Sequence, residues 1–123
     1  MKAVMAVTLV ALLSVLAAGC GPNNKELVVQ GRSQLDTGNL EQAKALFQRV
    51  LDRRPHDPDA LYYMGRTYHQ QGLFTQAIYY YKCAMDLDPA FAAAAHYKRM
   101  AEEQLQSQPD EPAPAQPAPD AAG

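Results

Sequence analysis

Apolar side chains in the middle of the chain recur with the spacing of amphipathic helices. They lie three and four positions apart in two runs, first Leu61, Met64, Gly65 and Tyr68, then Phe74, Ala77, Ile78, Tyr81, Ala84 and Met85. This spacing places them on one face of a helix. Gly72 separates the runs, and glycine ends helices readily because it adopts the left-handed backbone. The pattern predicts two helices joined by a tight turn.

The same arrangement occurs 34 residues earlier in the chain. Residues 24–57 and 58–91 share Leu27/Leu61, Gly31/Gly65, Arg32/Arg66, Gly38/Gly72, Gln42/Gln76, Ala43/Ala77, Asp52/Asp86 and Pro55/Pro89. The paired small residues allow close helix contacts, and the prolines end each second helix. A repeat of this length predicts an all-α fold, a short α-solenoid. We expect helix-turn-helix units at 25–57 and 58–91 and a capping helix at 92–107.

The longest apolar run stands at the start of the chain. Residues 3–18 follow Met1-Lys2 and contain only Thr8 and Ser14 as polar members. The run is shorter than the roughly 20 residues that span a bilayer. A positive start, an apolar stretch and small residues at its end are typical of a secretory signal peptide. We expect residues 1–19 to be this signal, with residues 20–24 forming a short tether.

Composition narrows the functional classes. The part after residue 19 is long enough for one small domain. It has no excess of basic residues, so it does not suggest a nucleic-acid partner. The three histidines, His56, His69 and His96, lack metal-ligand spacing. No catalytic motif stands out either, and we therefore expect no metal, no cofactor and no enzymatic activity.

The last residues, 108–123, are rich in proline and alanine and contain no large apolar residue. Such a segment buries too little surface to offset its ordering entropy, so we expect a disordered spacer. A docking role for this tail is the alternative.

The second unit, LYYMGRTYHQQGLFTQAIYYYKCAMDLDP, resembles the tetratricopeptide repeat. The residues that carry the resemblance are Leu61, Gly65, Tyr68, Gly72, Phe74, Ala77, Tyr81, Ala84 and Pro89. The resemblance covers residues 24–91, and residues 91–106 look like the extra helix that caps such arrays. It implies that the first helix of each unit lines a concave groove for a peptide or partner helix. The implied groove residues are Val28, Arg32, Leu35, Asp36, Tyr62, Arg66, His69 and Gln70, and His96 would extend the surface.

Two arginines occupy equivalent places in this implied groove. Arg32 and Arg66 would then point two guanidinium groups into one trough, which suits carboxylates on an acidic or C-terminal peptide. The alternative is a solvated face on which Arg32 pairs with Asp36, four residues further along the helix.

Six of the seven tyrosines lie between Tyr62 and Tyr81. Tyr68 and Tyr81 belong to the apolar stripes, whereas Tyr62, Tyr63, Tyr79 and Tyr80 cannot all be buried on the same two faces. Exposed tyrosines are common at interfaces, so we expect either an interaction surface or packing between helices.

The stretch SVLAAGCGPNN resembles the lipobox of bacterial lipoproteins. The resemblance implies that Cys20 is lipidated on sulfur and becomes the new N-terminus. Gly21 after the cysteine looks like an outer-membrane sorting signal if the cell is Gram-negative. An uncleaved membrane anchor and a plain secretory signal are the alternatives. A disulfide between Cys20 and Cys83 requires that Cys20 is not lipidated; Cys83 is otherwise a helix-packing residue.

These features predict a lipid-anchored adaptor that binds another envelope protein, as in pilus, secretion or outer-membrane assembly. Because two repeats bury a small core, help from a partner or from self-association is expected. The alternatives are a self-associating structural or chaperone-like subunit and an accessory subunit of an envelope enzyme.

Overall fold

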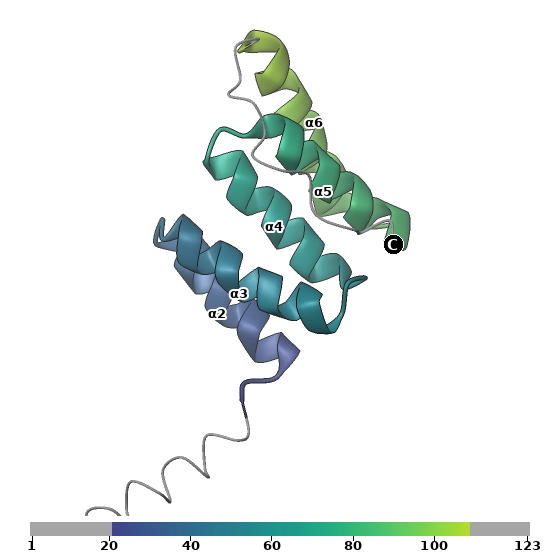
Figure 1. Ribbon diagram of the computed structural model, residues 1–123. Helices are drawn as coiled ribbons and strands as arrows, with labels where there is room; N and C mark the ends of the chain where they lie inside the picture. The colour runs from purple at the N-terminus through teal and green to yellow at the C-terminus, as the bar shows by residue number, and fades with distance from the viewer. Residues whose placement is uncertain (1–20, 109–123) are drawn as a thin grey trace, which may run out of the picture.

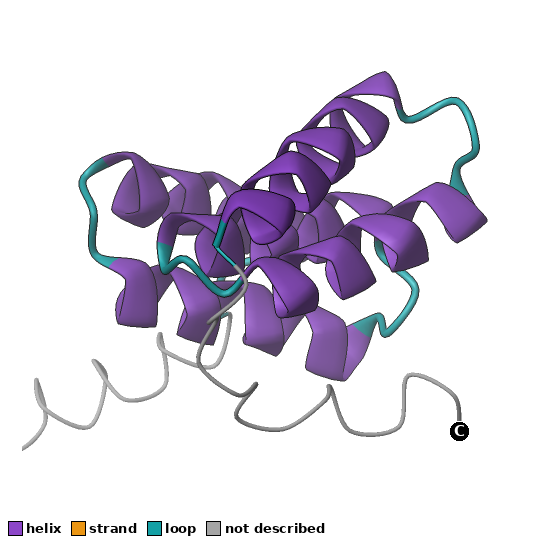
Figure 2. Cartoon of the chain, turned by 90° about the horizontal axis from the view of Figure 1, so that it is seen from above, coloured by secondary structure: helices purple, strands orange, loops and turns teal. Residues whose placement is uncertain are grey.

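A computed structural model of the chain describes residues 21–108. The helices are α2 (Asn24–Asp36), α3 (Leu40–Arg53), α4 (Pro58–Gln70), α5 (Phe74–Leu87) and α6 (Ala92–Ser107). Within this part of the chain no strand occurs (Figure 2), and no helix is long and apolar enough to cross a membrane. The expected signal peptide, Cys20 and nearly all of the Pro/Ala-rich tail lie outside the described residues.

Two helices begin at side-chain caps. The Asn23 carboxamide oxygen accepts a hydrogen bond from the Glu26 backbone N–H at 2.9 Å, and Asp57 accepts one from Ala60 at 3.0 Å. These bonds satisfy N–H groups that have no partner within the helix. Pro58 follows the Asp57 cap, where its missing N–H costs nothing.

The turn between the helices of each pair depends on glycine. Gly38 and Gly72 have φ angles of 80° and 78°, a left-handed conformation that side chains with a Cβ atom disfavour. The chain therefore reverses within a few residues after α2 and after α4.

Each helix pair packs around a glycine of its first helix. A Cβ atom on Gly31 would lie 2.4 Å from Phe47 Cε1, and one on Gly65 would lie 2.6 Å from Tyr81 Cε1. Neither distance is sterically possible. The aromatic ring of the second helix therefore occupies the space that a side chain on the first would need.

The helices stack in chain order as a short succession of antiparallel neighbours, from α2 at the lower left to α6 at the upper right (Figure 1). α2 packs on α3, α4 on α5, and α3 on α4, while α6 contacts α5 and α4. One repeat period after Gly65, α6 has Arg99 in place of a glycine. Because α6 lacks this small residue, it does not offer the space in which a second helix packs on the first. The predicted all-α fold, with two repeat units and a capping helix, is confirmed.

Candidate functional site

The first helices of the two units, together with α6, carry the predicted groove. Of its eight residues, Arg32, Asp36 and Gln70 are exposed, and Val28, Arg66 and His69 are half-buried. The other two are core residues, because Leu35 is 2% exposed and Tyr62 is 6% exposed.

The prediction that Leu35 and Tyr62 line the groove surface is therefore wrong. Leu35 lies in the last turn of α2, on the side that faces the core. The ring of Tyr62 lies against the rings of Phe91 and Tyr97, with centroids 4.9 Å and 6.0 Å away. The capping helix and the loop before it cover Tyr62, which its own unit alone would have left open.

The two equivalent arginines make the same kind of contact with the next unit. Arg32 Cζ lies 5.3 Å from the centroid of the Tyr63 ring, and Arg66 Cζ lies 4.1 Å from that of Tyr97. A guanidinium over an aromatic face is attracted by the electrons of the ring. These Arg–Tyr contacts connect α2 to α4 and α4 to α6 in the same way.

The arginines differ in how much of the guanidinium remains open. Arg66 also donates a hydrogen bond to the Tyr62 hydroxyl at 3.2 Å and is half-buried. Arg32 is exposed, and among residues 21–108 its ion pair with Asp36 is not observed. The Arg32 guanidinium is therefore more accessible to a carboxylate of a partner. The Arg66 guanidinium is held by contacts within the protein.

Arg32 also borders a hollow on the surface of α2. This hollow has a volume of about 360 Å³ and is lined by Val29, Arg32, Ser33, Asp36 and Thr37. It brings a cationic and an anionic member of the predicted groove together beside an exposed valine.

Tyr97 and Gln104 were not among the predicted site residues. Tyr97 stands 34 residues after Tyr63, so extending the repeat by one more period would have identified it. Gln104 gives no such signal, because its role depends on how α6 lies across the end of α4.

His69 joins three helices through its two ring nitrogens. Nε2 lies 2.6 Å from Gln104 Oε1 on α6, and Nδ1 lies 3.2 Å from the Tyr81 hydroxyl on α5. Since the amide oxygen only accepts, Nε2 carries the hydrogen and Nδ1 accepts from the tyrosine. The rings of Phe74 and Tyr97 meet the imidazole edge-on.

Burial lowers the pKa of His69, and the positive charge of Arg66 lowers it further, although the Gln104 hydrogen bond acts the other way. Burial raises the pKa of Tyr81, so its hydroxyl keeps its hydrogen and remains a donor. Protonation of His69 would leave that buried hydroxyl hydrogen without its acceptor.

We expect the stability of the protein to fall in mild acid because of His69. In the unfolded chain its pKa is ordinary, near 6.5, so unfolded molecules bind the proton more readily. The stabilisation is complete above about pH 6.5 and is lost as the pH falls through the lower folded pKa. Melting temperatures from about pH 8 to pH 5 measure the loss, which His69→Gln should reduce. The exposed His56→Gln is the control; parallel profiles for native protein and His69→Gln would contradict the assignment.

Fewer of the tyrosine side chains are exposed than an interaction surface made of them would require. Tyr62, Tyr80 and Tyr81 are buried, and Tyr79 is 37% exposed. The Tyr80 ring stacks on Tyr68 with centroids 5.4 Å apart. Of the two alternatives that the sequence left open, packing between helices applies to Tyr62 and Tyr80, because these rings fill spaces between helices.

Cys83 is half-buried on α5, and burial raises the pKa of its thiol. It packs against the core, in keeping with a helix-packing residue. Among residues 21–108 no three His, Cys, Asp or Glu side chains are grouped as a metal site would require.

Comparison with known proteins agrees with this architecture. A search of curated proteins gave no significant match. A family model described as tetratricopeptide repeat matches residues 28–90, which is more than half of the chain and includes most of both helix pairs. Such repeats generally mediate binding between proteins. The chain belongs to the tetratricopeptide-repeat family.

Proposed function

We propose that this protein is a membrane-anchored adaptor that binds another protein of the cell envelope through α2 and α4. The observation that carries the proposal is the open surface around Arg32, within a fold whose family binds proteins. Arg32 and Asp36 line this surface from α2, and Gln70, the last residue of α4, is also exposed.

The chemistry of this surface suits a segment with a carboxylate. The Arg32 guanidinium lies over the Tyr63 ring, which restricts its position without using its hydrogen-bond donors. A planar fork held in this way can bind a side-chain or C-terminal carboxylate with two hydrogen bonds. Asp36, in the same hollow, favours a basic residue nearby in the partner.

The anchor in this proposal is a lipid on Cys20. The apolar run that precedes Cys20 and the small residues around it support this assignment. Two or more acyl chains hold a protein stably on a bilayer, and the anchor would raise the concentration of the binding surface near partners there. With Gly21 after the cysteine, we place the protein on the periplasmic face of the outer membrane if the host is Gram-negative.

Crosslinking in intact envelopes, followed by capture of the protein, tests this function. We compare native protein with the Arg32→Glu variant. The control is Lys82→Glu, which makes the same change of charge at an exposed position on α5. A partner captured by native protein and Lys82→Glu, but lost from Arg32→Glu, is the expected result. Arg66→Glu is unsuitable as the main variant because Arg66 also contacts Tyr62 and Tyr97.

The same experiment can contradict the proposal in two ways. An unchanged set of partners with Arg32→Glu would move recognition away from this surface. Capture of the protein alone would favour a self-associating subunit.

A further inference from the structure

The outer face of α5 carries two of the three large apolar side chains that are exposed among residues 21–108. Tyr79 is 37% exposed and Leu87 is 43% exposed, and the half-buried Cys83 lies between them on the helix. These residues stand four positions apart, so they form one stripe along α5. The helix packs on α4 and α6 and makes no contact with α2 or α3 in the described chain. The stripe is therefore separate from the surface around Arg32.

A hollow adjoins the Leu87 end of this stripe. It has a volume of about 150 Å³ and is lined by Pro55, His56, Leu61, Cys83, Asp86 and Leu87. An apolar cavity of about this volume accommodates a benzene ring. The hollow thus offers a place beside Leu87 for one aromatic side chain of another molecule.

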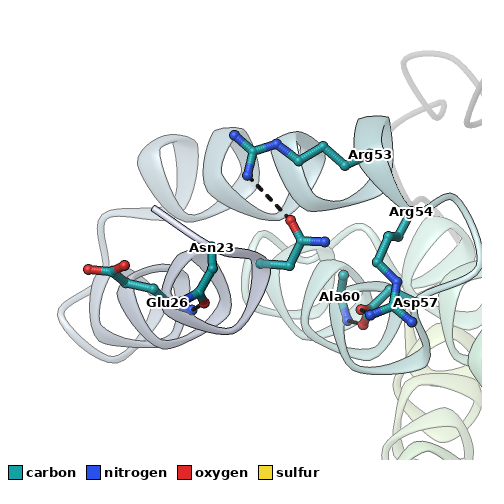
Figure 3. A network of polar contacts seen from close by, with 7 residues as sticks. Asn23, Glu26, Arg53, Arg54, Asp57 and Ala60 are labelled. Carbon is teal, nitrogen blue, oxygen red and sulfur yellow. Dashed lines mark hydrogen bonds and ion pairs between the residues drawn. The ribbon is translucent and has the colours of Figure 1, made fainter. Parts of the chain in front are cut away.

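The charged groups around this hollow are mostly engaged within the protein. Arg54 lies 3.9 Å from the Asp57 carboxylate, which also caps α4 (Figure 3). Arg53 points toward the start of α2, where its Nη1 donates to the Pro22 carbonyl oxygen at 2.9 Å. Asp88, just after α5, accepts a hydrogen bond from a backbone N–H of the following turn. These groups add little free charge beside the stripe.

Two exposed charged residues flank the stripe on α5 itself. Lys82 and Asp86 lie four positions apart, yet neither belongs to an ion pair among residues 21–108. The face therefore carries one available charge of each sign around an apolar centre. Such a face can complement a copy of itself.

The order of these residues is symmetric about Cys83. A two-fold interface brings the same patch of two copies together, so that residue i meets residue j and j meets i. With the axis at Cys83 and the two helices antiparallel, Tyr79 of one copy meets Leu87 of the other. Its ring then lies at the hollow beside Leu87. Lys82 comes within one helical turn of Asp86 in the second copy.

We propose that two copies of this protein associate through α5, with the helices antiparallel and centred on Cys83. The pairing buries the Tyr79 and Leu87 side chains and joins Lys82 to Asp86 on both sides of the axis. It leaves the Arg32 surface of each copy open. The pairing does not depend on the proposed adaptor function, but it would give the adaptor two binding surfaces.

Thiol crosslinking in intact envelopes tests the pairing. Two differently tagged copies of the full chain are produced together and treated with bismaleimidoethane, a short reagent that joins two thiols. We expect Cys83 of one copy to be linked to Cys83 of the other, in a product that carries both tags. Cys83→Ala should remove this product. An equal yield without the Cys83 thiol would overturn the pairing through α5.

Single cysteines at the ends of the stripe test the antiparallel register. Tyr79→Cys and Leu87→Cys are made separately, each with Cys83→Ala, and are combined in all pairs of tagged copies. In antiparallel helices centred on residue 83, position 79 of the two copies is offset by about eight residues, or about 12 Å. Links between 79 and 87 should therefore exceed links between two copies of either variant. The reverse order would contradict the antiparallel pair.

Reversal of charge tests the contact between Lys82 and Asp86. Lys82→Glu turns two attractive pairs into two repulsive ones and should lower the ratio of crosslinked to free chain about tenfold. Adding Asp86→Lys to this variant should restore the native ratio. Arg49→Glu, the same change of charge on exposed α3, should leave the ratio unchanged. An unchanged ratio in Lys82→Glu, or no recovery in the double variant, would overturn the pairing.

The self-contact and the partner contact can be separated in these samples. Lys82→Glu should lose self-crosslinking and still capture the envelope partner, because α5 does not contact α2 in the described chain. Arg32→Glu should lose the partner and retain self-crosslinking. Self-crosslinking that is lost with Arg32→Glu but not with Lys82→Glu would place the contact between copies at α2 and contradict the proposal.

Discussion

Replacing Tyr62 with alanine is expected to lower the free energy of unfolding by about 3–5 kcal/mol, the usual cost of removing a buried aromatic ring. Tyr62 is 6% exposed and contacts rings from α4, α5, α6 and the loop before α6. The loss is large for a domain of this size, since such domains are stable by about 5–15 kcal/mol. Urea or thermal unfolding measures it.

Two further variants make the Tyr62 result specific. Tyr79→Ala removes the same side chain from a position 37% exposed and should cost much less. Tyr62→Phe retains the ring and removes the hydroxyl that accepts from Arg66, so it should cost about 0.5–1.5 kcal/mol, or up to about 3 for a bond to a charged donor. If Tyr62→Ala unfolds like native protein and only weakens partner binding, Tyr62 belongs to an open groove after all.

Gly65→Ala is expected to destabilise the protein by about 1–3 kcal/mol, the usual cost of overpacking a core. On propensity alone, this change in a helix interior would stabilise by about 1 kcal/mol. The added Cβ atom, however, would lie 2.6 Å from the Tyr81 ring and 3.2 Å from the Ala77 carbonyl oxygen. Because Tyr81 is fully buried, its ring has no free space to move into.

Whether the free energy of unfolding of Gly65→Ala falls or rises relative to native protein tests this prediction. Chemical unfolding of Gly65→Ala is compared with that of Gln70→Ala, an exposed change on the same helix that should have little effect. A more stable Gly65→Ala would mean that helix propensity outweighs the contact and that α4 and α5 are not packed so closely.

Periodicity was sufficient to predict the helices because it reflects local geometry. Apolar residues three and four apart define a face, and Gly38 and Gly72 mark the turns that their positive φ angles then make. The 34-residue period also made Gly31 and Gly65 equivalent, and both lie beneath an aromatic ring. The apolar spacing, the turn glycines and the repeat period are all read from the order of residues along the chain, so a single sequence is enough to identify them.

The groove was harder to predict because exposure depends on the following unit. Position in the repeat made Arg32 and Arg66 equivalent, yet Arg32 is exposed whereas Arg66 is half-buried and also bonds the Tyr62 hydroxyl. Tyr62 is buried because Phe91 and Tyr97 lie against it. The pairing of His69 with Gln104 likewise depends on the path of α6.

The sequence by itself therefore determined the repeat, the number and order of its helices and the family, since these follow from local spacing and from residues that pack within a pair. Only the tertiary structure decided which side chains remain open to a partner, because burial arises from contacts between units far apart in the chain. The contact of Arg53 with Pro22 has the same origin, as it joins the end of α3 to the segment before α2.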